Sequence, residues 1–196
     1  GEYRRQRQMC IRDRSYPFNE SNAYLSDDGN TLFFSSSDNR NNTYGLSDMN
    51  DIWYRNKNNG VWGTPINLRE VNTIENDVIL GLYKNDLIIL RNGSIDYYDI
   101  NNQYKLKRTE KIDGFPPNYN LISGSINYSQ DKLFLSFEGF GTYGVEDIYT
   151  SKKNNNVWGR LTNIGSSVNS EYQDISPFLY KEDTCLLYTS DAADDI

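Results

Sequence analysis

The sequence predicts an all-β fold, a partial β-propeller of about three four-stranded sheets plus the first strand of a fourth. Three observations lead to this prediction. The composition favours strands, because the 196 residues include 16 Tyr, 8 Phe and 3 Trp. Strand-like runs alternate with turn signals along the whole chain, and no long segment has a helical period. A long motif is also repeated, as expected of a propeller.

The individual strands are predicted from short apolar and aromatic runs. The clearest are TLFFSSS (31–37), DIWYRN (51–56), LIILRN (87–92), KLFLSF (132–137) and DIYTSK (147–152). A related turn occurs four times, as LSDDGN (25–30), LYKNDL (82–87), YSQDKL (128–133) and LYKEDT (179–184). We interpret Asp27-Asp28-Gly29 as a hairpin turn rather than a calcium loop, because Gly accepts a positive φ and Asp can bond its own backbone.

The repeat gives the domain organisation. NDIWYRNKNNGVWGTPINL (50–68) recurs as EDIYTSKKNNNVWGRLTNI (146–164). The distance along the chain from the start of one copy to the start of the other is about twice the roughly 40–50 residues of a propeller blade. A further unit must therefore lie between the copies. It is found in weaker form, with Tyr104 near the position of Trp62 and Trp158. The predicted units are 20–70, 75–115, 120–168 and the start of another at 170–184.

Two repeated residue types have both a structural and a functional interpretation. Trp62 and Trp158 could stack on sugars, but their identical places in two units favour packing between neighbouring sheets. Asp51 and Asp147 could bind a ligand in a central channel. We expect them instead to accept hydrogen bonds from loop backbone.

These residues resemble the TolB-like, WD-related propeller repeats of envelope proteins, in LSDDGNTLFFSSS, in DIWYRNKNNGVWGTPINL and in SEYQDISPFLY. The resemblance covers nearly all of 15–184. It implies a periplasmic or outer-membrane-associated module, often beside an OmpA-like domain, that binds or scaffolds a protein or peptidoglycan-associated partner. The sequence departs from the family at Asp27, which replaces the turn proline, and in the middle unit, which lacks Trp.

Candidate contact residues lie in loops. The segment Asp38–Met49 is longer than the equivalent loop of the other copy, and long loops on a rigid scaffold often carry function. Tyr44, Tyr143 and Tyr172 are the candidate ligand-binding residues.

Catalysis is disfavoured, and no catalytic, cofactor or metal residue is predicted. The chain has no His, which removes Ser-His-Asp and Cys-His systems and most zinc sites. The alternative is the propeller of an enzyme, such as a prolyl-oligopeptidase-like gating domain or a glycosidase using Glu138, Glu146 and Asp147. The net charge of −7 argues against nucleic-acid partners. No apolar run reaches the roughly 20 residues needed for membrane insertion.

Both ends are predicted to be foreign to the natural protein. RRQRQMCIRD (4–13) and CLLYTSDAAD (185–194) can be encoded by opposite strands of one oligonucleotide that resembles a sequencing adapter. We therefore exclude 1–14 and 185–196, and with them Cys10 and Cys185, from the fold prediction. We expect the two terminal segments to be irregular or to fill strand positions, and CLLYTS is itself strand-like. A partial propeller leaves sheet faces open, so we expect the isolated chain to be marginally stable or prone to aggregation.

Overall fold

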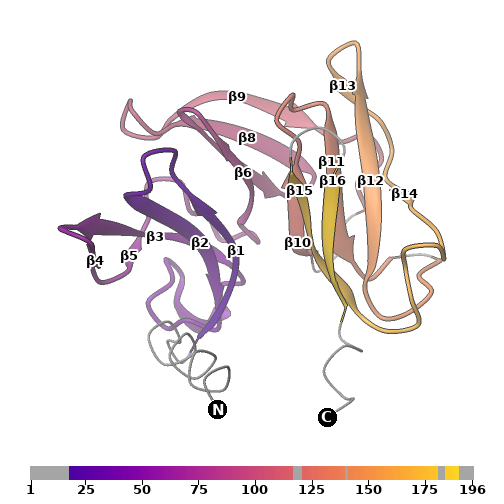
Figure 1. The fold of residues 1–196 in the computed structure, drawn as a ribbon, viewed down its shortest axis with the longest axis horizontal. Coiled ribbons are helices and arrows are strands. Elements are labelled where there is room, and N and C mark those ends of the chain that lie inside the picture. The colour runs from indigo at the N-terminus through magenta and orange to yellow at the C-terminus, as the bar shows by residue number, and fades with distance from the viewer. Residues whose placement is uncertain (1–17, 117–120, 140, 181–183, 190–196) are drawn as a thin grey trace.

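The computed structural model is almost entirely β-sheet (Figure 1). It describes residues 18–116, 121–139, 141–180 and 184–189. The predicted foreign segment 1–14 and residues 190–196 lie outside the described residues. One short 3-10 helix, η1 (Gly45–Ser47), lies in a long loop of the first sheet. None of the described segments forms a helix with the length and apolar character that a membrane span requires.

The first and third sheets share one architecture. Each is an antiparallel meander of three full strands, and its fourth position is shared by two short strands that both pair with the third. The first sheet contains β1 (Asn19–Leu25), β2 (Thr31–Ser37), β3 (Asp51–Asn58), β4 (Val61–Trp62) and β5 (Ile66–Asn67). The third contains β10 (Leu121–Ile126), β11 (Lys132–Phe137), β12 (Asp147–Asn154), β13 (Val157–Trp158) and β14 (Thr162–Asn163).

The second sheet is a more regular four-stranded meander, and a two-stranded hairpin follows the third sheet. The second sheet consists of β6 (Val78–Tyr83), β7 (Asp86–Arg91), β8 (Ser94–Asp99) and β9 (Lys105–Lys111). The hairpin consists of β15 (Asp174–Tyr180) and β16 (Thr184–Thr189). Strand β16 includes most of CLLYTS and pairs antiparallel with β15, so of the two outcomes expected for this segment the structure shows the strand.

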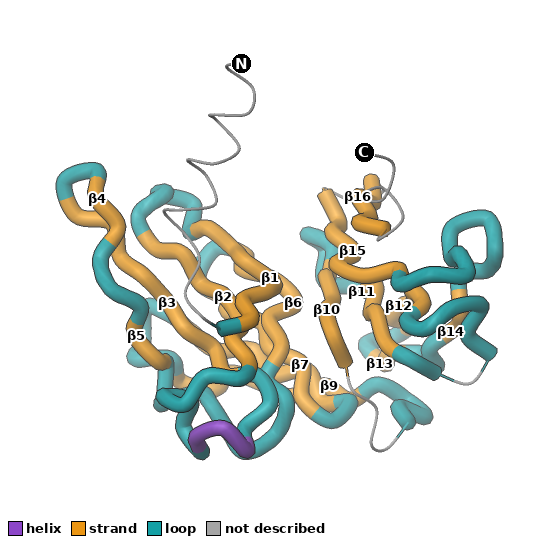
Figure 2. Tube along the Cα trace, turned by 90° about the horizontal axis from the view of Figure 1, so that it is seen from below, coloured by secondary structure: helices purple, strands orange, loops and turns teal. Residues whose placement is uncertain are grey.

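The first strands of successive sheets lie next to one another in space. Strand β6 contacts β1 and β10, and β10 contacts β15, so these strands form the inner edge of the assembly (Figure 2). Each of the four has a register shift against its second strand, for example between Ser21 and Tyr24 in β1 and between Ile79 and Gly81 in β6. Such a bulge interrupts the hydrogen-bond ladder locally and bends the strand that carries it. The predicted all-β, propeller-like fold is confirmed.

The core lies between the sheets rather than within one of them. Between the first and second sheets it contains Phe33, Ile52, Leu68, Val71, Ile79, Leu87, Ile89 and Tyr98. A larger cluster joins the second and third sheets, and it includes Leu90, Ile95, Tyr97, Leu135, Phe137 and Trp158. Phe134, Ile148 and Leu179 join the third sheet to the hairpin. Sheets that bury their faces against neighbours stabilise one another.

The aromatic residues of the repeat occupy different environments. Trp158 is 0% exposed and packs against the second sheet, as predicted. Tyr104 packs against Phe33 of the first sheet with its ring edge-on at 6.5 Å, so it takes the place of the missing Trp of the middle unit. The prediction for Trp62 is wrong, because this side chain is 36% exposed. Trp158 shows that this position faces the preceding sheet, and the described residues include no sheet before the first.

Candidate functional site

The described loops lie at two ends of the sheets. The long-loop face comprises 38–50, 68–77, 138–146 and 164–173, which connect second to third strands or one sheet to the next. The turn face comprises 26–30, 84–85, 100–104 and 127–131, which connect first to second or third to fourth strands. On the turn face, Asp28 accepts hydrogen bonds from Ser26 Oγ (2.6 Å) and Asn30 N (3.0 Å), which confirms the hairpin turn predicted at Asp27-Asp28-Gly29.

Asp51 fixes the long loop of the first sheet. Its Oδ2 accepts hydrogen bonds from the backbone N–H of Thr43 (2.6 Å), the Thr43 hydroxyl (2.8 Å) and Asn67 Nδ2 (2.6 Å). Asn72 adds a second anchor, since its amide bonds both the N–H and the C=O of Ile52 at 2.8 and 3.0 Å. Buried polar groups satisfied in this way hold a loop in one conformation.

Asp147 does the same in the third sheet. It accepts hydrogen bonds from Tyr143 N (2.9 Å) and Asn163 Nδ2 (2.6 Å). Asn169 bonds the N–H and C=O of Ile148 at 2.9 and 3.0 Å, as Asn72 does for Ile52. The prediction that Asp51 and Asp147 accept hydrogen bonds from loop backbone is confirmed.

The three predicted contact tyrosines lie on the long-loop face. Tyr44, Tyr143 and Tyr172 are 52%, 55% and 49% exposed. Tyr143 and Tyr172 belong to touching loops, because an added Cβ at Gly144 would lie 2.1 Å from the Tyr172 carbonyl oxygen. Tyr44 lies two sheets away, on the loop anchored by Asp51. Leu46 and Met49 of that loop are also exposed, so it presents apolar as well as aromatic surface.

A second carboxyl group lies beneath the Tyr44 loop. Asp48 is buried and accepts a hydrogen bond from Tyr44 N at 3.0 Å. Burial, with the neighbouring Asp51 as a further cause, raises the pKa of Asp48 to about 6. Like-charged neighbours disfavour ionisation of both groups at once. Asp48 is therefore a pH-sensitive group of the loop.

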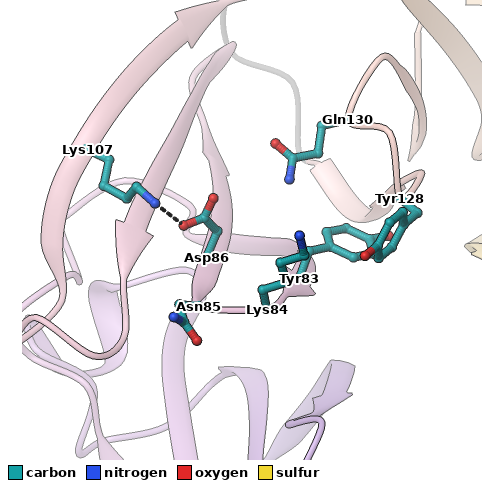
Figure 3. A pocket seen from close by; sticks show the side chains of 7 residues that line it. All are labelled: Tyr83, Lys84, Asn85, Asp86, Lys107, Tyr128 and Gln130. Carbon is teal, nitrogen blue, oxygen red and sulfur yellow. Dashed lines mark hydrogen bonds and ion pairs between the residues drawn. The ribbon is translucent and has the colours of Figure 1, made fainter.

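The turn face carries a pocket of about 330 Å³ between the second and third sheets (Figure 3). Tyr83 and Tyr128 form one wall, with ring centroids 5.5 Å apart and ring planes nearly perpendicular. An ion pair between Lys107 Nζ and Asp86 Oδ1 (2.7 Å) lies on the other side. Gln130 completes the rim and accepts a hydrogen bond from an exposed arginine of β9.

A larger hollow of about 620 Å³ adjoins this pocket at the ends of the inner strands. Its lining includes Tyr24, Tyr83, Tyr128 and Phe178. Tyr128 and Phe178 are 56% and 40% exposed, whereas Tyr24 is held by a hydrogen bond from its hydroxyl to the Leu80 carbonyl (2.8 Å). Burial raises the pKa of Tyr24, which keeps the hydroxyl protonated as a donor. We call the pocket and the hollow together the aromatic hollow.

The aromatic hollow has the general features of a ligand site. It is concave, its aromatic rings come from three different sheets and the hairpin, and a few polar groups surround them. A ring whose hydroxyl is hydrogen-bonded to a backbone carbonyl, as in Tyr24, can stack on a sugar or contact an apolar side chain with little loss of conformational entropy. Sequence reasoning identified the segments of Tyr83 and Tyr128 only as turns. The signal that could have found them is the aromatic residue just before the turn in both LYKNDL and YSQDKL.

The acids considered for glycosidase chemistry do not form an obvious catalytic pair. The Asp147 carboxylate already accepts hydrogen bonds from the loop backbone and from Asn163 Nδ2. Glu138 is exposed, whereas Glu146 is buried, and the backbone carbonyl of Glu146 accepts a hydrogen bond from Asp174 N. In the described part of the chain, no three Asp, Glu, His or Cys side chains group as metal ligands.

Comparison with known proteins gives structural likenesses alone. No family model and no curated protein matches the sequence. One similar solved structure comes from a structural and mechanistic analysis of two prolyl endopeptidases, with 14% identity, 82% of this chain and 21% of that chain covered, and a TM-score of 0.43. Another is a hypothetical selenium-binding protein from Sulfolobus tokodaii, with 15% identity, 74% and 40% coverage, and a TM-score of 0.40. The chain thus spans about a fifth and two fifths of these proteins.

Proposed function

We propose that this chain is a non-catalytic propeller module that binds a partner through the aromatic hollow. The observation that carries the proposal is the convergence of Tyr24, Tyr83, Tyr128 and Phe178 on one concavity at the ends of the inner strands. Exposed aromatic rings in a concave site are typical of binding surfaces. The use of Asp51 and Asp147 to hold loops supports a binding role over an acid–base one.

The finer assignment rests on the sequence motifs. LSDDGNTLFFSSS and the repeated D-I-aromatic and V-W-G segments resemble TolB-like repeats. We therefore propose a periplasmic or outer-membrane-associated setting and a protein or peptidoglycan-associated ligand. The long-loop face with Tyr44, Tyr143 and Tyr172 is a second contact surface in this proposal.

Binding variants separate the two surfaces. Purified full-length chain is titrated with soluble peptidoglycan fragments and, separately, crosslinked to an envelope protein extract. Tyr128→Ala is expected to weaken binding about tenfold or more, because a central aromatic contact contributes roughly 2 kcal/mol. Tyr44→Ala, which changes an equally exposed tyrosine on the long-loop face, measures the contribution of that second surface.

The alternative, that the chain is the propeller of an enzyme, predicts different results. Hydrolysis of a prolyl peptide or an aryl glycoside by the purified chain, lost in Glu146→Gln, would contradict the non-catalytic proposal. Loss of binding in Tyr44→Ala, with Tyr128→Ala unaffected, would move the binding site to the long-loop face.

A further inference from the structure

The interface between the second and third sheets contains a carboxylate held by a Lys–Trp pair. Glu110 lies on the outer strand β9. Its Oε2 accepts a hydrogen bond from Trp158 Nε1 (2.8 Å) and forms an ion pair with Lys153 Nζ (2.7 Å). Lys153 also lies over the Trp158 ring, with Nζ 4.8 Å from the centroid. Burial by itself would raise the pKa of Glu110, but its bonds with Lys153, Trp158 and Arg108 hold it below the ordinary value.

The first sheet presents the same pair without its carboxylate. Lys57 pairs with Trp62 across β3 and β4 in the same register as Lys153 with Trp158 across β12 and β13. Lys57 Nζ lies 5.4 Å from the centroid of the Trp62 ring. In the part of the chain that the structure describes, no carboxylate bonds Lys57 Nζ or Trp62 Nε1. Trp62 is accordingly 36% exposed, against 0% for Trp158.

Chemistry and exposure together define what this surface fits. The ammonium group of Lys57 and the indole N–H of Trp62 are both donors, so the complementary group is an acceptor with negative charge. The indole ring and the exposed neighbouring Val61 add apolar surface, which a flat sheet face can cover. Around Trp158 the acceptor is the single glutamate Glu110 on the outer strand of the second sheet. The ring centroid of Tyr97, on the strand next to it, lies 6.0 Å from Lys153 Nζ.

We propose that the Lys57–Trp62 pair is the receptor for a carboxylate on the outermost strand of a further propeller sheet. This sheet packs on the face of the first sheet that is turned away from the second. Its third strand carries an aromatic ring beside the lysine, as Tyr97 does in the second sheet. The inference is independent of the ligand site proposed above, because the pair lies on a sheet face rather than in the aromatic hollow.

The test uses the second sheet of the chain as the probe. A copy of residues 71–120 is inserted between Phe18 and Asn19 of the full chain, so that the copied sheet reaches β1 through the connection that normally reaches β10. Acrylamide quenching of Trp62 fluorescence, obtained by difference from Trp62→Phe, is expected to fall to the level of Trp158. The control insertion carries Glu110→Gln in the inserted copy alone and is expected to leave Trp62 more accessible. Equal quenching with and without the insertion would overturn the proposal.

A second measurement tests the proposal even if the chain with the insertion does not fold. In the unmodified chain, Lys153→Gln should lower the melting temperature by about 4 °C or more, because it removes a charged partner from a partly buried carboxylate. Lys57→Gln should leave it unchanged, since no carboxylate is yet in place. If Lys57→Gln and Lys153→Gln lower the melting temperature equally, Lys57 already has a carboxylate partner and the proposal fails.

Discussion

Replacing each repeat tryptophan by phenylalanine tests whether equivalent positions contribute unequally to stability. Trp158→Phe keeps most of the buried ring but removes the N–H that bonds Glu110. A hydrogen bond to a charged group contributes about 1.5–3 kcal/mol, and the smaller ring leaves a void that adds to the loss. We expect the free energy of unfolding to fall by about 2–4 kcal/mol. Trp62→Phe changes a half-exposed side chain with no such bond, and we expect a loss of about 0.5 kcal/mol or less.

Urea unfolding followed by far-UV circular dichroism measures both values without depending on tryptophan emission. The ratio between the two variants matters more than either absolute value, because the total stability of a native protein is only about 5–15 kcal/mol. Equal losses in Trp158→Phe and Trp62→Phe would refute the reasoning. They would mean that the first sheet already has a neighbour packed over Trp62.

Three further outcomes follow from the long-loop face. Asp48→Asn should raise the melting temperature at pH 8 but not at pH 4. The pKa of Asp48 in the folded chain, about 6, lies above the ordinary 3.8, so the wild-type chain has its full stability below about pH 4 and loses stability as the pH rises through 6. An equal rise of the melting temperature at both pH values would count against this. Asn169→Ala should lower the free energy of unfolding by about 1–3 kcal/mol, because it removes the Asn169 acceptor from the buried N–H of Ile148, whose C=O keeps its hydrogen bond from Ile164 N. A loss below about 0.5 kcal/mol in urea unfolding would show that water replaces the amide. Gly144→Ala should speed proteolysis of the 138–146 loop, since its Cβ meets the Tyr172 carbonyl oxygen, and unchanged cleavage would show that the loops separate freely.

Local signals in the sequence were sufficient to predict five of the longer strands, β2, β3, β7, β11 and β12. TLFFSSS and KLFLSF coincide with β2 and β11, because short runs that contain aromatic and other apolar residues and follow turn residues favour strands. The roles of Asp51 and Asp147 were also predictable, because an acid just before a buried strand can reach the amides of the preceding loop.

Features that depend on what lies beside a sheet could not be predicted in this way. Trp62 and Trp158 share the local sequence V-W-G, yet Trp62 is exposed and Trp158 is buried, since the second sheet packs over Trp158 and no described sheet packs over Trp62. Arg91 was not anticipated either. Its guanidinium is buried among Asp77 (2.7 Å), Asp96 (2.8 Å) and the Tyr98 hydroxyl (2.8 Å). Such a network is built from two strands, β7 and β8, and the connection before β6, and no short stretch of sequence contains it.

The asparagines that follow each outer strand have a consequence for folding cooperativity. Asn72 and Asn169 lie beyond the last strand of their sheets, yet each completes the hydrogen bonding of the third strand, at Ile52 and Ile148. A sheet therefore cannot reach its final structure until the connection to the next sheet is in place. Folding units should overlap rather than end where the sheets end. Hydrogen exchange at the amides of Ile52 and Ile148 should then report the opening of the following connection, not of the strand that contains them.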